Sequence, residues 1–337
     1  MFNNSNGNGT PALLLPRRLS RSRPSVHTAL TLPRANGWAP APPKGLFAMH
    51  DAQPPQRLGF QLRMEMAAAV YGLGTTGTRM ANGAVHLLLR ELERIPACLQ
   101  YLMIDGASPD SIAVGNDHFI STDLHGCGTD PRQGELQFYR HYSEIHRAVD
   151  GQMQTISQFD PVIPVCYSPQ EALGVWIFGG CGGASGGMLH PMITLVNDVA
   201  QQRRVRHLRV HVVLMGPDMP MRDNTRSVHP KQRCVVADTF SGNLVKIIAD
   251  MCSSVILAET RPDGTTFHMA SADRVWSVTV VDQSNGSFQW STTNELAEMI
   301  AWDCFLRIFT QLGKFEEDRV KDLEQLNISA RRTLEKE

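Results

Sequence analysis

Short apolar runs alternate with longer amphipathic segments from Met66 to Leu312. The apolar runs have the length of strands, and several of them lie between glycine-rich segments, which indicates buried β-strands. The predicted strands are 67–71, 99–104, 118–121, 174–178, 208–215, 255–259 and 275–282. Apolar residues that recur every three to four positions predict amphipathic helices. These helices are expected over 80–94, 134–149, 188–201, 235–251 and 292–312, the last one capped by Ser291 or Thr292.

The regular alternation of strand, turn and helix predicts an α/β fold. A mostly parallel sheet with helices on both faces follows from this order, and the long helix over 292–312 ends it. In such sheets ligands bind beyond the carboxyl ends of the strands. We therefore expect the turns that follow the strands to carry the chemistry.

Three parts are predicted along the chain. Residues 1–62 are rich in proline, arginine and serine, and Asp51 is their only acidic residue. Such a composition buries too little apolar surface to fold and indicates a disordered basic tail. The tail is interpreted as a flexible segment or as residues that precede the true start near Met49 or Met64, as an organelle transit peptide, or as an electrostatic arm. Residues 63–313 form the folded domain, and 314–337 form a charged helix or tail.

Composition narrows the class of protein. The 337 residues are 42% hydrophobic and 19% charged, with a net charge of −1. These values are typical of a soluble globular protein and give no global basic field that would attract nucleic acid or an anionic membrane. The chain has no apolar stretch of about 18 residues that could span a bilayer. Its seven cysteines include no CxxC pair, which favours reduced thiols and a cytoplasmic location.

The first glycine-rich turn follows the strand 67–71 and reads Gly72-Leu73-Gly74-Thr75-Thr76-Gly77. Glycine allows a sharp turn and a close approach of the backbone to a phosphate, and a helix N-terminus favours anions. The pattern GxGxxG is weak by itself, because a nicotinamide or flavin dinucleotide site has the same spacing.

The second glycine-rich turn is denser and has six glycines among residues 179–187. Packing alone explains such a density poorly, because each glycine loses backbone entropy on folding. We therefore predict that its N–H groups surround an anion. The phosphate-loop consensus GxxxxGK[ST] is absent, since no lysine follows either turn. A third glycine-rich segment over 124–134 also precedes a predicted helix.

These three turns, in this order, resemble those of the tubulin/FtsZ family of GTPases. The first resembles the family's opening GxGGxG loop, and residues 180–186 resemble its signature GGGTGSG. Residues 126–131 resemble the GAGxNP loop that faces the terminal phosphate. Leu73, Thr75, Thr76 and Arg79 make the chain most similar to the bacterial tubulin-like proteins outside FtsZ proper. The resemblance covers residues 66–312, the family's nucleotide-binding domain and central helix.

The resemblance implies binding of GTP or GDP with Mg²⁺ and head-to-tail self-association into cytoskeletal filaments. It also implies that one Asn follows a strand and one Asn starts the central helix to contact the base. The strand before the first Asn is either 255–259 or 275–282. The implied nucleotide-binding residues are Gly72, Leu73, Gly74, Thr75, Thr76, Gly77, Asp105, Gly126, Gly128, Thr129, Asp130, Gly180, Cys181, Gly182, Gly183, Ala184, Ser185, Gly186, Asn285 and Asn294.

The chain departs from the family at two places. Cys181, Gly183 and Ala184 replace Gly, Thr and Gly of the signature, so one threonine hydroxyl is lost. After the central helix, the family's acidic NxDxxD loop is not found, and the remaining length leaves no room for its second domain. The resemblance therefore implies nucleotide binding and leaves GTP hydrolysis open, with no catalytic residue to name. Asp218 and Arg233 are further candidates for sugar and phosphate contacts.

Two alternatives remain open at this point. A nicotinamide-dependent oxidoreductase would use Gly72, Gly74 and Gly77, with an acidic residue about 20 residues later to bind a ribose. Asp105 comes 28 residues after Gly77, and this alternative leaves the second glycine-rich turn without a role. A degenerate tubulin-like scaffold without nucleotide turnover would explain the altered signature.

Overall fold

A computed structural model of the chain describes residues 62–106, 118–122, 130–157, 159–161, 163–216, 230–252, 256–260, 264, 266–270, 275–282 and 292–310. The predicted tail, except Leu62, and the predicted C-terminal segment 314–337 lie outside these residues.

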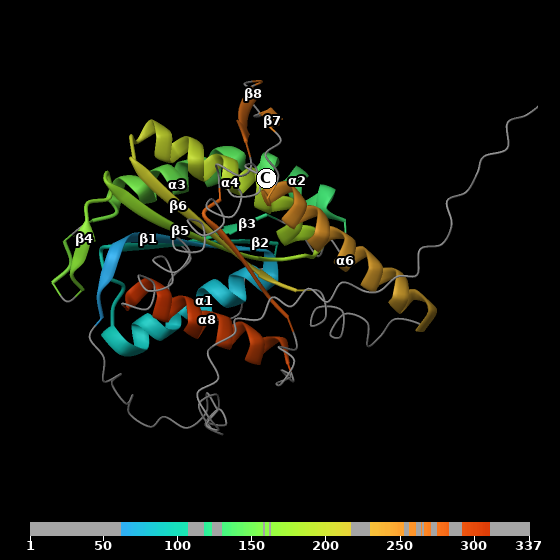
Figure 1. Cartoon of the computed structure of the whole chain (residues 1–337), viewed down its shortest axis with the longest axis horizontal. Helices are drawn as coiled ribbons and strands as arrows, with labels where there is room; N and C mark the ends of the chain where they lie inside the picture. The colour runs from blue at the N-terminus through green and yellow to red at the C-terminus, as the bar shows by residue number, and fades with distance from the viewer. Residues whose placement is uncertain are drawn as a thin grey trace, which may run out of the picture. The chain divides into compact units, whose positions relative to one another are not determined.

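A parallel β-sheet forms the centre of the folded domain (Figure 1). Its strands lie in the order β3-β2-β1-β5-β6-β9, and every neighbouring pair is parallel. Their bounds are Met64–Leu73 (β1), Leu99–Asp105 (β2), Phe119–Ser121 (β3), Ala172–Gly180 (β5), His207–Met215 (β6) and Ser277–Val281 (β9). A short strand, Val165–Tyr167 (β4), pairs with the start of β1. The predicted mostly parallel α/β sheet is therefore confirmed.

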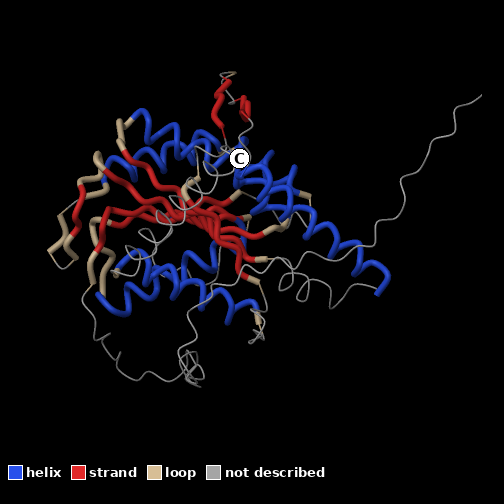
Figure 2. Tube along the Cα trace, in the orientation of Figure 1, coloured by secondary structure: helices blue, strands red, loops and turns tan. Residues whose placement is uncertain are grey.

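Helices cover both faces of this sheet (Figures 1 and 2). One face carries α1 and α8, and the other carries α2, α3 and α4. The bounds are Gly74–Leu92 (α1), Pro131–Arg140 (α2), Tyr142–Thr155 (α3), Gly183–Gln202 (α4), Pro230–Cys252 (α6) and Thr293–Phe309 (α8). None of the helices within the described residues combines the length and the apolar character that crossing a membrane requires.

One sequence-based prediction about these elements was wrong. The expected helix 134–149 is two helices, α2 and α3, because the chain leaves helical geometry at His141. The expected strand 255–259 is confirmed to within one residue, but it does not join the main sheet. It forms the strand Ile256–Thr260 (β7), which pairs antiparallel with Thr266–Ala270 (β8) in a separate sheet. The main-sheet strand that precedes position 285 is therefore β9.

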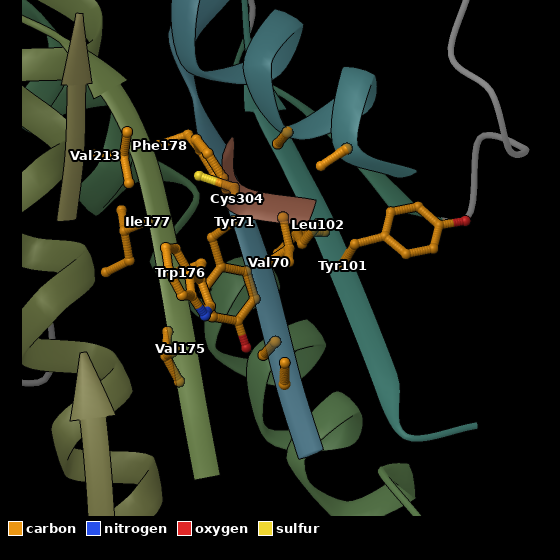
Figure 3. Close-up of a cluster of buried hydrophobic side chains, with 14 of the residues drawn as sticks. Val70, Tyr71, Tyr101, Leu102, Val175, Trp176, Ile177, Phe178, Val213 and Cys304 are labelled. Atoms are coloured by element: carbon orange, nitrogen blue, oxygen red, sulfur yellow. The ribbon is translucent and has the colours of Figure 1, made fainter. Parts of the chain in front are cut away.

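The core lies between the sheet and the helices on each face. Residues 66–73 of β1 and all of β5 are buried, as expected for parallel strands that are covered on both faces. Figure 3 shows part of this core, in which Phe178 of β5 and Cys304 of α8 lie near each other. On α8 the predicted apolar face is confirmed, since Leu296, Ile300, Phe305, Ile308 and Phe309 are buried.

Helix α8 runs along α1 in the same direction. The Arg63 N–H donates to the Phe309 carbonyl over 2.8 Å, which ties the last turn of α8 to the start of β1. At mid-helix, a Cβ at Gly83 of α1 would lie 2.9 Å from the Cβ of Ala301. The Thr292 hydroxyl caps the start of α8 by accepting from the Glu295 N–H over 3.1 Å, which confirms one of the two predicted caps. Because the end of α8 lies at the start of β1, α8 begins toward the carboxyl end of the sheet.

Helices α2 and α4 approach each other closely through glycine. A Cβ at Gly187 of α4 would overlap the Pro131 carbonyl oxygen and lie 2.7 Å from the Glu135 nitrogen. A Cβ at Gly134 of α2 would lie 2.6 Å from the Gly183 carbonyl oxygen. These neighbours are backbone atoms, which cannot rotate away. The sequence-based interpretation that packing explains the glycines of 179–187 poorly is therefore wrong for Gly187.

Gly187→Ala is expected to lower the free energy of unfolding by about 3 kcal/mol, because the added methyl group overpacks two helix backbones. Gly151→Ala is the matched control, since Gly151 also lies within a helix but has open space around its Cβ position. There alanine should raise the free energy of unfolding by about 0.5–1 kcal/mol. Urea unfolding of both variants measures the difference, and equal shifts in the two variants would contradict the close packing of α2 on α4.

Candidate functional site

The candidate site lies at the carboxyl ends of β1 and β5, which are neighbours in the sheet. The chain leaves β1 into α1 on one face and leaves β5 into α4 on the opposite face (Figure 1). In open α/β sheets, ligands bind where neighbouring strands send their connections to opposite faces. Both predicted glycine-rich turns therefore come to the position where this fold binds ligands.

The first turn is tighter than the sequence indicates. Strand β1 extends to Leu73 and α1 begins at Gly74, so no loop separates them. Gly74 makes the turn with a φ of 63°, a conformation that strongly favours glycine. A Cβ at Gly77 would overlap the Phe178 carbonyl oxygen. The first turn of α1 therefore packs directly against the end of β5, and the expected helix start at residue 80 was six residues late.

The second turn is nearly as short. Strand β5 reaches Gly180 and α4 begins at Gly183, so only Cys181 and Gly182 lie between them. The Cys181 side chain is fully buried, and its carbonyl accepts a hydrogen bond from the Asn243 amide of α6 over 3.2 Å. A Cβ at Gly180 would lie 3.4 Å from the Cβ of Thr76. The second turn therefore contacts the first turn of α1.

A hydrogen bond joins the two turns. The Ser185 hydroxyl, in the first turn of α4, donates to the Leu73 carbonyl at the end of β1 over 2.6 Å. A Cβ at Gly74 would lie 2.6 Å from this hydroxyl oxygen and 3.3 Å from the Ala184 Cβ. The structure thus brings together the predicted residues of the first and second turns, which are more than a hundred positions apart in the sequence.

The starts of α1 and α4 lack the usual caps. Their N-cap residues are Leu73 and Gly182, and within the described residues neither start has a side-chain cap or an acidic residue in its first turn. The first N–H groups of a helix have no intrahelical acceptor, and the helix dipole makes this end partly positive. Two such ends that lie together can bind an anion with several oxygen atoms, such as a phosphate chain.

Helix α2 starts differently. Its N-cap is Asp130, whose carboxylate accepts from the Arg132 N–H over 3.1 Å. Asp130 was predicted to bind nucleotide, and the structure uses it as a helix cap. Because Gly134 of α2 packs on the backbone of Gly183 and Ala184, the start of α2 lies beside the start of α4.

Asp105 ends β2 and faces the first turn of α1. It is 6% exposed, and its carboxylate accepts from the Gly106 N–H over 2.7 Å and from Thr75. Burial raises the pKa of Asp105, while these hydrogen bonds and the charge of Arg79 oppose the rise. These contacts place the Asp105 carboxylate beside the first glycine-rich turn.

The other residues predicted to contact the nucleotide are either exposed or outside the described part of the chain. Asn294 is exposed in the first turn of α8. Outside the described residues lie Gly126, Gly128, Thr129, Asn285 and Asp218, and also the side chain of Arg233 in α6. Within the described ranges, no three His, Cys, Asp or Glu side chains are grouped to hold a metal ion.

Sequence reasoning missed Asn243, which supports the second turn through the Cys181 carbonyl. Its partner is 62 residues away. Asn243 follows Gly242 within a helical segment, and no motif marks it. Only the contact between α6 and the start of α4 reveals its role.

No protein-family model matches the sequence, and no curated protein matches it. Among solved structures, CetZ from Methanosaeta thermophila strain DSM 6194 is 12% identical with a TM-score of 0.40, covering 70% of this chain and 52% of that chain. TubZ of Bacillus thuringiensis serovar israelensis also matches, as GDP-form and GTPγS-form protofilaments. Identities are 12% and 11%, TM-scores 0.37 and 0.39, and each match covers 72% of this chain and 55% of that chain.

The chain spans about half the length of these solved structures.

Asp105→Asn is expected to raise the free energy of unfolding at pH 7. A raised pKa means that folding disfavours the ionised carboxylate, and this penalty develops as the pH rises from the ordinary value of 3.8 toward the raised pKa. Below pH 3.8 the free energy of unfolding of the variant should therefore equal that of the unaltered chain. Denaturant unfolding of both proteins across this pH range measures it.

Asp150→Asn provides the opposite control. Its hydrogen bonds with Arg203, both 2.7 Å long, lower the pKa of Asp150. This variant should lose stability at pH 7, and the loss should shrink as the pH falls through the lowered pKa. A loss of stability at pH 7 in both variants would contradict the environment described for Asp105.

Proposed function

We propose that this chain is a tubulin/FtsZ-like guanine-nucleotide-binding protein that self-associates head to tail. The observation that carries the proposal is the meeting of two uncapped helix starts, α1 and α4, at the ends of neighbouring strands. The Ser185–Leu73 hydrogen bond joins these starts, and among the described residues neither start has a side-chain cap that would compete for its N–H groups. This arrangement suits the phosphate chain of a nucleotide.

In this proposal, the N–H groups of 74–76 and 183–185, which have no acceptor within their helices, bind the phosphate oxygens. Charge-assisted bonds from backbone N–H groups need no particular side chain, so the change of the signature at Cys181, Gly183 and Ala184 leaves them available. When bound, Mg²⁺ would neutralise phosphate charge. The Asp105 carboxylate lies beside the first turn and orients it through Thr75.

The preference for guanine comes from the sequence resemblance, through Asn285 and Asn294 as base contacts. The proposed self-association also comes from the sequence resemblance. A head-to-tail contact joins two different surfaces, and it produces an open filament when the rotation between copies does not close. Hydrolysis is not part of the proposal, because none of the described residues is placed as a catalytic base.

A dinucleotide-dependent oxidoreductase remains as the second candidate, and two observations favour it. The strand order β3-β2-β1-β5-β6-β9 matches the order 3-2-1-4-5-6 of dinucleotide-binding sheets. Asp105 also ends the second strand, where those proteins bind a ribose. However, the Asp105 carboxylate is buried and bonded to Thr75, and the uncapped start of α4 has no role in that scheme.

Gly182→Asp separates nucleotide binding from stability. Gly182 is the N-cap of α4 with φ −74° and ψ 174°, a conformation that aspartate adopts readily. An aspartate there should cap α4 and stabilise the fold by about 1 kcal/mol. It should also occupy the N–H groups and repel phosphate, so GTP affinity should fall by at least about a hundredfold, or about 3 kcal/mol. Thermal unfolding and calorimetric titration of the full chain measure the two effects.

Gly182→Asn is the matched control, because asparagine caps a helix as well as aspartate but carries no charge. It should stabilise α4 equally and weaken GTP binding less than aspartate does. If Gly182→Asp binds GTP as tightly as the unaltered chain, the start of α4 is not the phosphate site.

A further inference from the structure

The Ser185 hydroxyl makes an unusual bond for its position. Ser185 is the third residue of α4, where a serine side chain ordinarily bonds to local backbone groups of its own helix. Here the hydroxyl is buried and donates to the Leu73 carbonyl, the last residue of β1, over 2.6 Å. Ser185 therefore joins the first turn of α4 to the residue immediately before α1.

The atoms around the Ser185–Leu73 bond leave no space for a side chain at position 74. The Cβ position of Gly74 lies 2.6 Å from the Ser185 hydroxyl oxygen and 3.1 Å from the Ser185 nitrogen. A side chain at position 74 would separate the two helix starts, and the positive φ of Gly74 disfavours one independently. The hydroxyl oxygen thus occupies the space that glycine leaves open, and the distance between the two helix starts depends on both residues.

We propose that Ser185 is a positioning residue that sets the separation of the two helix starts, so that one phosphate chain binds to both. This inference rests on the proposed function and adds a substrate preference to it. A nucleoside di- or triphosphate offers the oxygen atoms of two or three phosphate groups to the N–H groups of both starts, whereas a monophosphate offers those of a single phosphate group. The bond therefore selects polyphosphates over monophosphates.

The physical reason is preorganisation. Groups that are held at the correct separation before binding lose less entropy when the ligand arrives. Ser185→Ala removes the only bond described between the Leu73 carbonyl and α4 and leaves that carbonyl without its buried donor. The two helix starts, each packed on a different face of the sheet, would then move relative to each other, and a ligand that contacts both would bind more weakly.

The test measures the affinities of the full chain for GDP and for GMP, both with Mg²⁺, by calorimetric titration. Ser185→Ala should weaken GDP binding about tenfold and change GMP binding by less than about twofold. Ser185→Thr keeps a hydroxyl and should restore most of the GDP affinity. If Ser185→Ala does not fold, Ser185→Cys gives the same comparison, because a thiol is a weak donor of similar size.

Thr194→Val is the matched control on the same helix. Thr194 and Ser185 are each 5% exposed, but the Thr194 hydroxyl donates within α4, to the His190 carbonyl over 3.0 Å. This control should leave the ratio of GDP to GMP affinity unchanged, whatever its effect on thermal unfolding.

The outcomes separate this inference from the proposed function. Unchanged GDP affinity in Ser185→Ala, or equal losses for GDP and GMP, would overturn the positioning role while nucleotide binding stands. If the unaltered chain binds neither nucleotide, the proposed function fails, and this inference fails with it.

Discussion

The close approach of α4 to the end of β1 is the constraint on which the rest of the site depends. Strands β1 and β5 are neighbours, but their connections leave toward opposite faces of the sheet, so the chain itself does not hold α1 and α4 together. The Ser185–Leu73 bond and the absence of a side chain at Gly74 do so instead. Because of this contact, two partly positive helix ends lie at one edge of the sheet, with the buried carboxylate of Asp105 beside them.

The glycines in and beside the two turns serve three purposes that the sequence cannot distinguish. Gly77 and Gly187 allow backbone atoms of neighbouring elements to approach, against β5 and α2 respectively. Gly74 provides a backbone conformation that other residues rarely adopt. Gly182 starts α4 without a side-chain cap. A high density of glycine therefore predicts that the backbone approaches another group closely. Only the structure shows that at Gly77 and Gly187 this group is the backbone of a neighbouring element.

Much of the fold could be predicted from the sequence. Strands that are covered on both faces need continuous apolar runs, so β1, β2, β5 and β6 were evident. The starts of α1 and α4 were predicted too late, because glycine has low helix propensity and tertiary packing overrides it here. The break at His141 follows no glycine or proline signal. The pairing of β7 with β8 depends on contacts between strands, which local patterns do not show.

The candidate site was predicted in part. The two glycine turns and Asp105 come together as expected, since strand order alone places their ends at one edge. The capping role of Asp130 and the support from Asn243 depend on particular contacts in space and have no local signature.

Calorimetric titration of the full chain with GTP, ATP and NAD, each with Mg²⁺, tests the central claim most directly. The account predicts saturable binding of GTP that is tighter than that of ATP, and no saturable binding of NAD. Binding of NAD without any response to GTP would contradict the account and establish the edge formed by β1 and β5 as a dinucleotide site.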